Sequence, residues 1–267
     1  MPSPKAIGLI GFGRIGQYLA DRIAEDPHTT LRFVCVRDPA SVSESTSVSD
    51  SNVAVVPDPG DLTDRDVDLI VEAAHADVLA AHGADLLEVS DVLALSTTVF
   101  ADREVEAELS EACDAGGTRL FVPHGAVLGT DGLQDGRPSL ESVTITTRKN
   151  PDNIDFERAD ISSADVDAET VLFDGSTRDI CGKFPRNVNS HATIAIAGIG
   201  FDRTTSKLIA DPAASEATHE IVAEGPGTRL EITRVSSIEG VTGSYTLDSI
   251  WGTVSRIPDH TPGTTVV

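Results

Sequence analysis

The chain has 267 residues, 40% of them hydrophobic, which is enough to build buried cores and too many for a disordered chain. Forty-three acidic residues against twenty basic ones give a formal charge of -23, which repels phosphate backbones and anionic lipid surfaces. We therefore expect no nucleic-acid and no membrane partner.

The acidic residues are scattered over every segment, whereas the basic set contains only four lysines, with arginine making up the rest. One interpretation is an ordinary acidic soluble protein. We favour a halophilic surface, because the Debye length falls to ~3 Å at 1 M salt and the self-repulsion of the surface is then screened. This interpretation predicts stability that rises with salt.

The composition also bears on location and metals. No stretch reaches the roughly 18 apolar residues of a membrane helix, and the N-terminal run lacks the pattern of a signal peptide, so we expect a cytoplasmic protein. The cysteines, Cys35, Cys113 and Cys181, are odd in number and far apart, which predicts three buried small hydrophobes without disulfides. Without H-x-x-x-H or H-E-x-x-H spacing, we predict no metal site.

The first half of the chain alternates short apolar runs with helical patterns. The runs that predict strands are 5–10, 31–36, 53–56, 68–71, 92–95 and 120–122. Helical spacing occurs after residue 14 and over 76–89 and 102–115, and the Ser-rich stretch 40–52 is expected to be a loop or a frayed helix. This α/β alternation predicts a Rossmann domain, a doubly wound parallel sheet, over residues 1–123.

After Pro123 the pattern changes to longer alternating strands. Residues 142–147 predict a strand, and 220–224 with 229–233 predict a hairpin around 225–227. An apolar helix is expected within 187–200, buried against the sheet. We predict a second, α+β domain over 124–244. A C-terminal helix and tail, 245–267, follow it, and this segment could pack on the first domain.

The first apolar run leads into Gly11-Phe12-Gly13-Arg14-Ile15-Gly16, which opens a helix. In that context a G-x-G-x-x-G run binds a dinucleotide: Gly11 permits the tight turn, Gly13 leaves room for phosphates, and Gly16 lets helix and strand pack closely. We predict a cofactor site formed by all six residues; the alternative is a purely structural turn.

Asp38 ends the second strand, about 20 residues further on, where a carboxylate accepts the two ribose hydroxyls. It favours NAD, whereas the neighbouring Arg37 could pair with the 2′-phosphate of NADP. We predict NAD, with NADP as the alternative.

Several further runs are distinctive. They are Val71-Glu72-Ala73-Ala74, Gly125-Ala126, Phe184-Pro185-Arg186-Asn187-Val188-Asn189, Asp211-Pro212 and Thr218-His219-Glu220-Ile221. On these runs the sequence resembles the L-aspartate dehydrogenase family, colinearly from the glycine turn to the hairpin near residue 233. The resemblance implies a nucleotide-binding domain, an α+β domain, and interconversion of L-aspartate with oxaloacetate and ammonia through iminoaspartate, using NAD or NADP.

By that resemblance His219 is the active-site histidine, and Ala126 and Asn189 contact the nucleotide. A histidine that titrates near neutrality suits the proton transfers of amine oxidation. The substrates expected are a dicarboxylate amino acid and ammonium. We expect Lys149 to pair with a substrate carboxylate, with Asn187 as a further substrate contact and with Arg148 and Arg186 as alternatives to Lys149.

The sequence departs from the family pattern at several places. His124 stands where the family usually has serine, Ser190 and His191 where it has small apolar residues, and Thr98 near a usual glycine; residues 240–245 replace an N-P-K-T type segment. For His124 and His191 the alternatives are polar contacts near the cofactor or packing, and we favour packing for His191.

Two other functions stay open beside aspartate oxidation. One is a related dehydrogenase acting on another small amino or hydroxy acid, and the other is a non-catalytic NAD(P)-binding regulator. If the enzyme is an aspartate dehydrogenase, its iminoaspartate can feed NAD biosynthesis. Base rates favour a homodimer.

Overall fold

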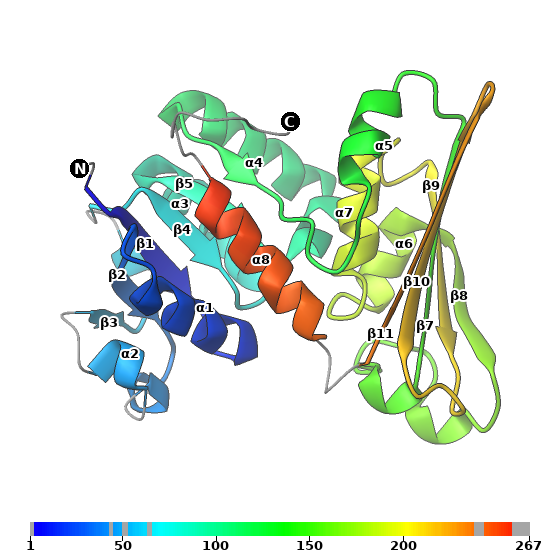
Figure 1. The fold of residues 1–267 in the computed structure, drawn as a ribbon, viewed down its shortest axis with the longest axis horizontal. Coiled ribbons are helices and arrows are strands. Elements are labelled where there is room, and N and C mark those ends of the chain that lie inside the picture. Colours follow the sequence, from blue (N-terminus) through cyan, green and yellow to red (C-terminus); the bar gives the residue numbers. More distant parts are fainter. Residues whose placement is uncertain (1–2, 43–44, 50–52, 63–65, 238–242, 258–267) are drawn as a thin grey trace. The chain divides into compact units, whose positions relative to one another are not determined.

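Two separate sheets organise the chain, one in each of the compact units Met1–Pro123 and His124–Val267 (Figure 1). The computed structural model describes residues 3–42, 45–49, 53–62, 66–237 and 243–257. The predicted tail 258–267, residues 240–242 of the segment 240–245 and part of the Ser-rich stretch 40–52 lie outside these residues. None of the described helices has the length and apolarity to cross a membrane.

The first unit is built on a six-stranded parallel sheet in the order β3-β2-β1-β4-β5-β6. The strands are β1 (Lys5–Ile10), β2 (Thr29–Cys35), β3 (Ala54–Val56), β4 (Leu69–Glu72), β5 (Asp91–Ala94) and β6 (Leu120–Phe121). β4 is buried at all four positions, as in a parallel sheet covered on both faces. The strand order is that of a dinucleotide-binding Rossmann sheet, in which ligands bind at the carboxyl ends of the strands beside β1 and β4.

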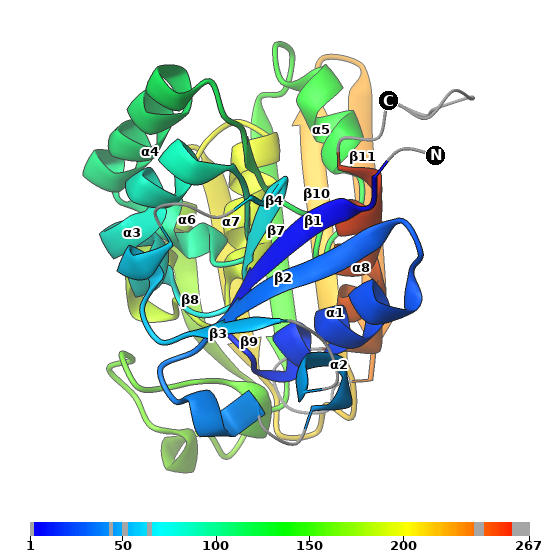
Figure 2. The same ribbon diagram turned by 90° about the vertical axis from the view of Figure 1, so that its left-hand side faces the viewer.

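Helices cover both faces of this sheet (Figure 2). α1 (Arg14–Glu25) and the short α2 (Thr46–Ser49) lie on one side, and α3 (Ala76–Val89) and α4 (Arg103–Gly116) on the other. Local sequence fixes the ends of α4: the Asp102 carboxylate accepts a hydrogen bond from the Glu104 N–H at 2.9 Å, and Gly117 adopts φ 63 at the C-terminus. The described residues of this unit also form the 3-10 turns η1 (Pro39–Val42), η2 (Pro59–Asp61) and η3 (Thr97–Ala101).

The second unit contains a mixed sheet in the order β11-β10-β7-β9-β8. Its strands are β7 (Ser142–Lys149), β8 (Thr170–Ser176), β9 (Thr204–Ala210), β10 (Ala217–Gly225) and β11 (Thr228–Ser236). β7 and β9 are parallel, and the other neighbours are antiparallel. The remaining elements are α5 (Thr130–Gly136), α6 (Thr177–Lys183), α7 (Asn189–Ala197), α8 (Ser244–Arg256), η4 (Pro151–Asn153) and η5 (Ser163–Asp165).

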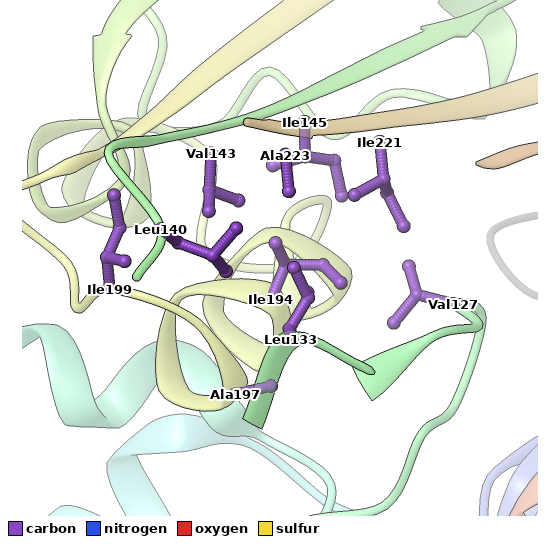
Figure 3. Close-up of a cluster of buried hydrophobic side chains, with 10 residues drawn as sticks. All are labelled: Val127, Leu133, Leu140, Val143, Ile145, Ile194, Ala197, Ile199, Ile221 and Ala223. Atoms are coloured by element: carbon purple, nitrogen blue, oxygen red, sulfur yellow. The ribbon is translucent and has the colours of Figure 1, made fainter. Parts of the chain in front are cut away.

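One face of the mixed sheet packs on α5 and α7 through a hydrophobic cluster (Figure 3). The register aligns this face in rows across three strands: Val143, Ala223 and Leu230 form the first row, and Ile145, Ile221 and Ile232 the second. The next row is polar, with His219 between Thr147 and Arg234. The same face is therefore apolar at one end and carries ionisable groups at the other.

The α/β fold class with a second α+β unit is confirmed. The expectation of three buried cysteines is correct for Cys35 and Cys181, but Cys113 is partly exposed. The sequence patterns did not predict α5, α6, β8 or β9.

Candidate active site

The glycine turn between β1 and α1 has the backbone that dinucleotide binding requires. Gly11 adopts φ +92, and a Cβ there would lie 2.6 Å from the Ala73 carbonyl oxygen; a Cβ at Gly16 would lie 2.3 Å from the Gly11 oxygen. At Gly13, by contrast, no described atom lies within 4 Å of an added Cβ. The residues of the turn thus fit the cofactor: two glycines are required by packing, and the third leaves open space at the start of α1.

Asp38 follows β2, the strand that is hydrogen-bonded to the glycine turn. The Gly11 N–H donates a hydrogen bond to the Cys35 carbonyl at 2.9 Å, which ties the turn to the end of β2, three residues before Asp38. The Asp38 carboxylate is exposed and accepts from the Ala40 N–H at 3.0 Å. Arg37 is exposed as well, so the structure leaves both cofactor interpretations in place.

Glu72 supports the carboxyl end of β4 next to this turn. Its fully buried carboxylate accepts hydrogen bonds from the Ala74 N–H at 2.8 Å, the Ser96 N–H at 3.0 Å and the Ser96 hydroxyl at 2.9 Å. Burial raises the pKa of this carboxyl group, although the same hydrogen bonds favour its charged form. Glu72 thereby joins the loops after β4 and β5.

In the second unit, the polar end of the sheet collects His219, Lys149 and Arg234. His219 lies on β10 directly opposite Thr147 of β7 on one side and Arg234 of β11 on the other. Lys149 follows Thr147 on the same face of β7 and is only 4% exposed. A partly exposed imidazole is therefore flanked by two cationic side chains.

This environment keeps His219 neutral. Loss of hydration and the positive charges of Arg234 and Lys149 lower the pKa of His219 to about 3. Burial likewise lowers the pKa of Lys149 to about 8, against the opposing effect of the Asp155 carboxylate. At neutral pH the site presents a neutral imidazole beside a protonated lysine. The expectation of a histidine that titrates near neutrality is therefore wrong for this arrangement, because partial burial and two nearby cations disfavour the imidazolium.

The structure separates Lys149 from the two alternative carboxylate partners. Arg148 belongs to the other face of β7, where it forms ion pairs with Glu169 and Asp211. Arg186 is 58% exposed and pairs with Asp155 at 3.1 Å. Because both arginines already have carboxylate partners, Lys149 is the basic residue of the three that is available within the site.

The other predicted residues lie in segments around α7 and before α5. Asn187 is buried, and its Oδ1 accepts from the Asp155 N–H at 3.0 Å, while its Nδ2 has no hydrogen-bond partner among the described residues. Asn189 begins α7. The Ala126 carbonyl accepts a hydrogen bond from Arg234 Nη1 at 2.8 Å, and His124 is exposed and bonded to Thr130.

His191 is fully buried in the first turn of α7. Its Nε2 lies 2.8 Å from the Thr147 hydroxyl, but within the described part of the chain its Nδ1 has no hydrogen-bond partner. Burial, His219 and Lys149 lower the pKa of His191 well below its usual value, so it is neutral. His191 is thus packed in the interior with one ring nitrogen, Nε2, beside a hydroxyl and the other, Nδ1, without a described partner.

Thr147 and Arg234 were not candidates from the sequence. The signal that could have found Arg234 is the hairpin itself, since the pairing of 220–224 with 229–233 extends by one step to place Arg234 opposite His219. Over the residues that the structure describes, no group of three or more His, Cys, Asp or Glu side chains is arranged to hold a metal ion.

Comparison with known families divides the chain as the sheets do. Residues 11–123 match the model described as homoserine dehydrogenase, NAD binding domain, and residues 131–257 match aspartate dehydrogenase, C-terminal. The L-aspartate dehydrogenase of Brucella anthropi is 35% identical over 237 residues, covering 87% of each chain. That of Nitrosopumilus maritimus is 29% identical, covering 83% of this chain and 84% of its own.

Solved structures agree on the fold. Aspartate dehydrogenase from Thermotoga maritima has a TM-score of 0.74 at 22% identity, covering 97% of this chain and 99% of its own. Scyllo-inositol dehydrogenase from Lactobacillus casei, solved with bound NAD(H) and scyllo-inositol, has a TM-score of 0.58 at 15% identity, covering 96% and 89%.

The Rossmann sheet with its glycine turn and the ionisable site of the second unit define an NAD(P)-dependent dehydrogenase. The match to the aspartate dehydrogenase family contains every strand of the mixed sheet. The relatives extend the similarity into the first unit. The chain belongs to the aspartate dehydrogenase family.

Proposed function

We propose that this enzyme oxidatively deaminates L-aspartate to oxaloacetate and ammonia through iminoaspartate, and runs the reverse reductive amination. The observation that carries the proposal is the neutral His219 beside the buried ammonium of Lys149. A dicarboxylate needs cationic partners, and deamination needs a base that is free of its proton at working pH.

Bound NAD(P) supplies the hydride acceptor for the C–H bond at the amine-bearing carbon. The imidazole of His219 then accepts a proton from the water that attacks the imine carbon, and returns it to the departing nitrogen as ammonia leaves. Its low pKa keeps it unprotonated before that step. The two negative charges of a bound dicarboxylate would offset Arg234 and Lys149 and so make the imidazole a stronger base during the reaction. In the reverse direction the same imidazole takes the proton that ammonia loses as it adds to the carbonyl carbon.

Lys149 binds one substrate carboxylate in this scheme. Burial makes the ammonium a stronger partner than a solvated lysine, because the low local dielectric strengthens the attraction. The buried Nδ2 of Asn187 is a second donor suited to a substrate oxygen. Both groups would orient the substrate without taking part in the proton transfers.

In this proposal the glycine turn holds the cofactor. The N–H groups at the start of α1 bind the pyrophosphate and Asp38 binds a ribose. Ala126 and Asn189 are the further nucleotide contacts that the resemblance to the family implies.

The test is a spectrophotometric assay with NADH or NADPH, oxaloacetate and ammonium. Rapid ammonium-dependent oxidation of the reduced cofactor supports the proposal. Turnover with a different small oxo acid instead, or cofactor binding without any turnover, would favour the related dehydrogenase or the non-catalytic regulator.

We also propose a homodimer formed through the second face of the mixed sheet. Helices α5, α6 and α7 all lie on the other face (Figure 1). The second face carries the alternate residues of β10 and β11, including the exposed Val235 and the partly exposed Val222. Light scattering after size-exclusion chromatography tests this, and a monomeric mass would contradict it.

A further inference from the structure

The proposed reaction assigns no role to Arg234. It lies across β10 from the Lys149 strand, so that His219 stands between a strand with a lysine and a strand with an arginine. Two pairs further along the same register, Ser236 lies opposite Ala217. On the other side of β10, Arg148 lies opposite Thr218, and Lys149 is the next residue of β7. The residue of β10 at the centre of this region, Ala217, is small.

The guanidinium of Arg234 is fixed but incompletely bonded. Nη1 donates to the Ala126 carbonyl at 2.8 Å, and the group lies 4.8 Å from the ring centre of Tyr245 on α8. Nη2 is buried, and no described residue accepts a hydrogen bond from it. A Cβ added to Gly243 would lie 3.5 Å from both Nη2 and the Ser236 hydroxyl, so Nη2 lies near Gly243 and Ser236.

An unpartnered guanidinium N–H in a half-buried site costs free energy unless a ligand accepts its hydrogen bond. The ionisable side chains beside it are His219, which is neutral and lies opposite it on β10, and Tyr245, whose ring it overlies. Neither can serve as its counter-ion. A second anionic group is the ligand chemistry that satisfies Nη2 and offsets the paired positive charges.

We propose that Arg234 binds the second carboxylate of the substrate while Lys149 binds the first, so that the two cations together select four-carbon dicarboxylates over monocarboxylates. This inference rests on the proposed function. It assigns the two ends of the substrate to β11 and β7, with His219 between them. Arg234 then sets substrate specificity, a role distinct from the proton transfer of His219.

The decisive measurement is binding of succinate and of butyrate to the NAD-loaded enzyme by calorimetry, which requires no turnover. For Arg234→Gln we expect the dissociation constant of succinate to rise at least tenfold, and that of butyrate to change less than threefold. Arg229→Gln is the matched control, because Arg229 lies on the same strand but pairs with Glu224 and Glu231 in solvent. It should leave both constants unchanged.

A merely structural role of Arg234 predicts a different result. If its bond to Ala126 only holds a cofactor-binding segment, Arg234→Gln should weaken NADH and both acids alike, and that outcome overturns the proposal. Unchanged succinate binding also overturns it. Arg234→Lys should restore part of the succinate affinity. The two proposals can fail separately. If Arg234→Gln selectively loses succinate binding but the unmodified enzyme does not turn over oxaloacetate, the carboxylate site is supported and the proposed reaction is refuted.

Discussion

Thr147 and His219 lie directly opposite each other in the antiparallel pairing of β7 with β10, and the Thr147 hydroxyl is 2.8 Å from Nε2 of His191. The two imidazoles therefore approach the same threonine from different elements, a strand and a helix. Both are neutral at pH 7, because burial and the nearby cations lower the pKa of each.

Replacing His219 tests its role as the base. We expect His219→Ala to reduce kcat by ~10²-fold or more, since a positioned general base contributes about that much. NADH affinity, measured by fluorescence titration, should stay within twofold of the unmodified enzyme. His28→Ala, at an exposed histidine of the first unit, is the control. Near-normal turnover of the His219 variant would remove the imidazole from the mechanism.

The ammonium of Lys149 predicts an alkaline limit to activity. Its pKa is lowered to about 8, so the protonated form that binds a carboxylate is present below that pH and is lost as pH rises through it. We expect kcat/KM for oxaloacetate to fall above pH 8. In Lys149→Arg the guanidinium stays charged, and the fall should move to higher pH even if the absolute rate is lower. An unshifted limit would assign the titration to another group.

The glycine turn predicts different consequences for two similar substitutions. Gly13→Ala adds a Cβ that meets no described atom, so Tm should stay within about 2 °C while NADH binding weakens at least tenfold. Gly16→Ala places a Cβ 2.3 Å from a backbone oxygen, so it should destabilise the fold as well. Differential scanning calorimetry and NADH titration separate these effects. Full NADH affinity in Gly13→Ala would place the pyrophosphate elsewhere.

Asp38 provides a test of cofactor preference. Loss of its exposed carboxylate should raise KM for NAD far more than KM for NADP, because the ribose of NADP carries a phosphate in place of one hydroxyl. Steady-state kinetics of Asp38→Ala with both cofactors measures the ratio. An equal effect on the two constants would contradict the assignment to the ribose.

The surface charge predicts a salt dependence. With a formal charge of -23, self-repulsion should destabilise the folded chain in dilute buffer and be screened in molar KCl. We expect Tm to rise between the two conditions. Sodium sulfate at equal ionic strength separates screening from effects of the particular salt. Equal melting temperatures would favour an ordinary acidic protein.

Much of the fold could be predicted because its signals are local. The strand, glycine turn and helix at residues 5–25 appear where the apolar spacing places them, and the two-residue turn at Pro226 and Gly227 closes the expected hairpin. α5 was missed because its seven residues include glycines at 132 and 136, so its helical form depends on packing of Leu133 into the core. β8 and β9 are antiparallel neighbours, but α6 and α7 lie between them in the chain, so no local hairpin signal marks their pairing.

The sequence by itself determined the dinucleotide turn, because the turn depends on a short run of residues in a fixed order. The role of His219 was expected from the resemblance to the aspartate dehydrogenase family. Only the tertiary structure decided that Lys149, rather than Arg148, shares a face with His219, and that Arg234 completes the row. Side chains alternate between the two faces of a strand, so adjacent basic residues have opposite surroundings. Which face is buried, and what lies across the next strand, is set by packing between segments distant in the chain.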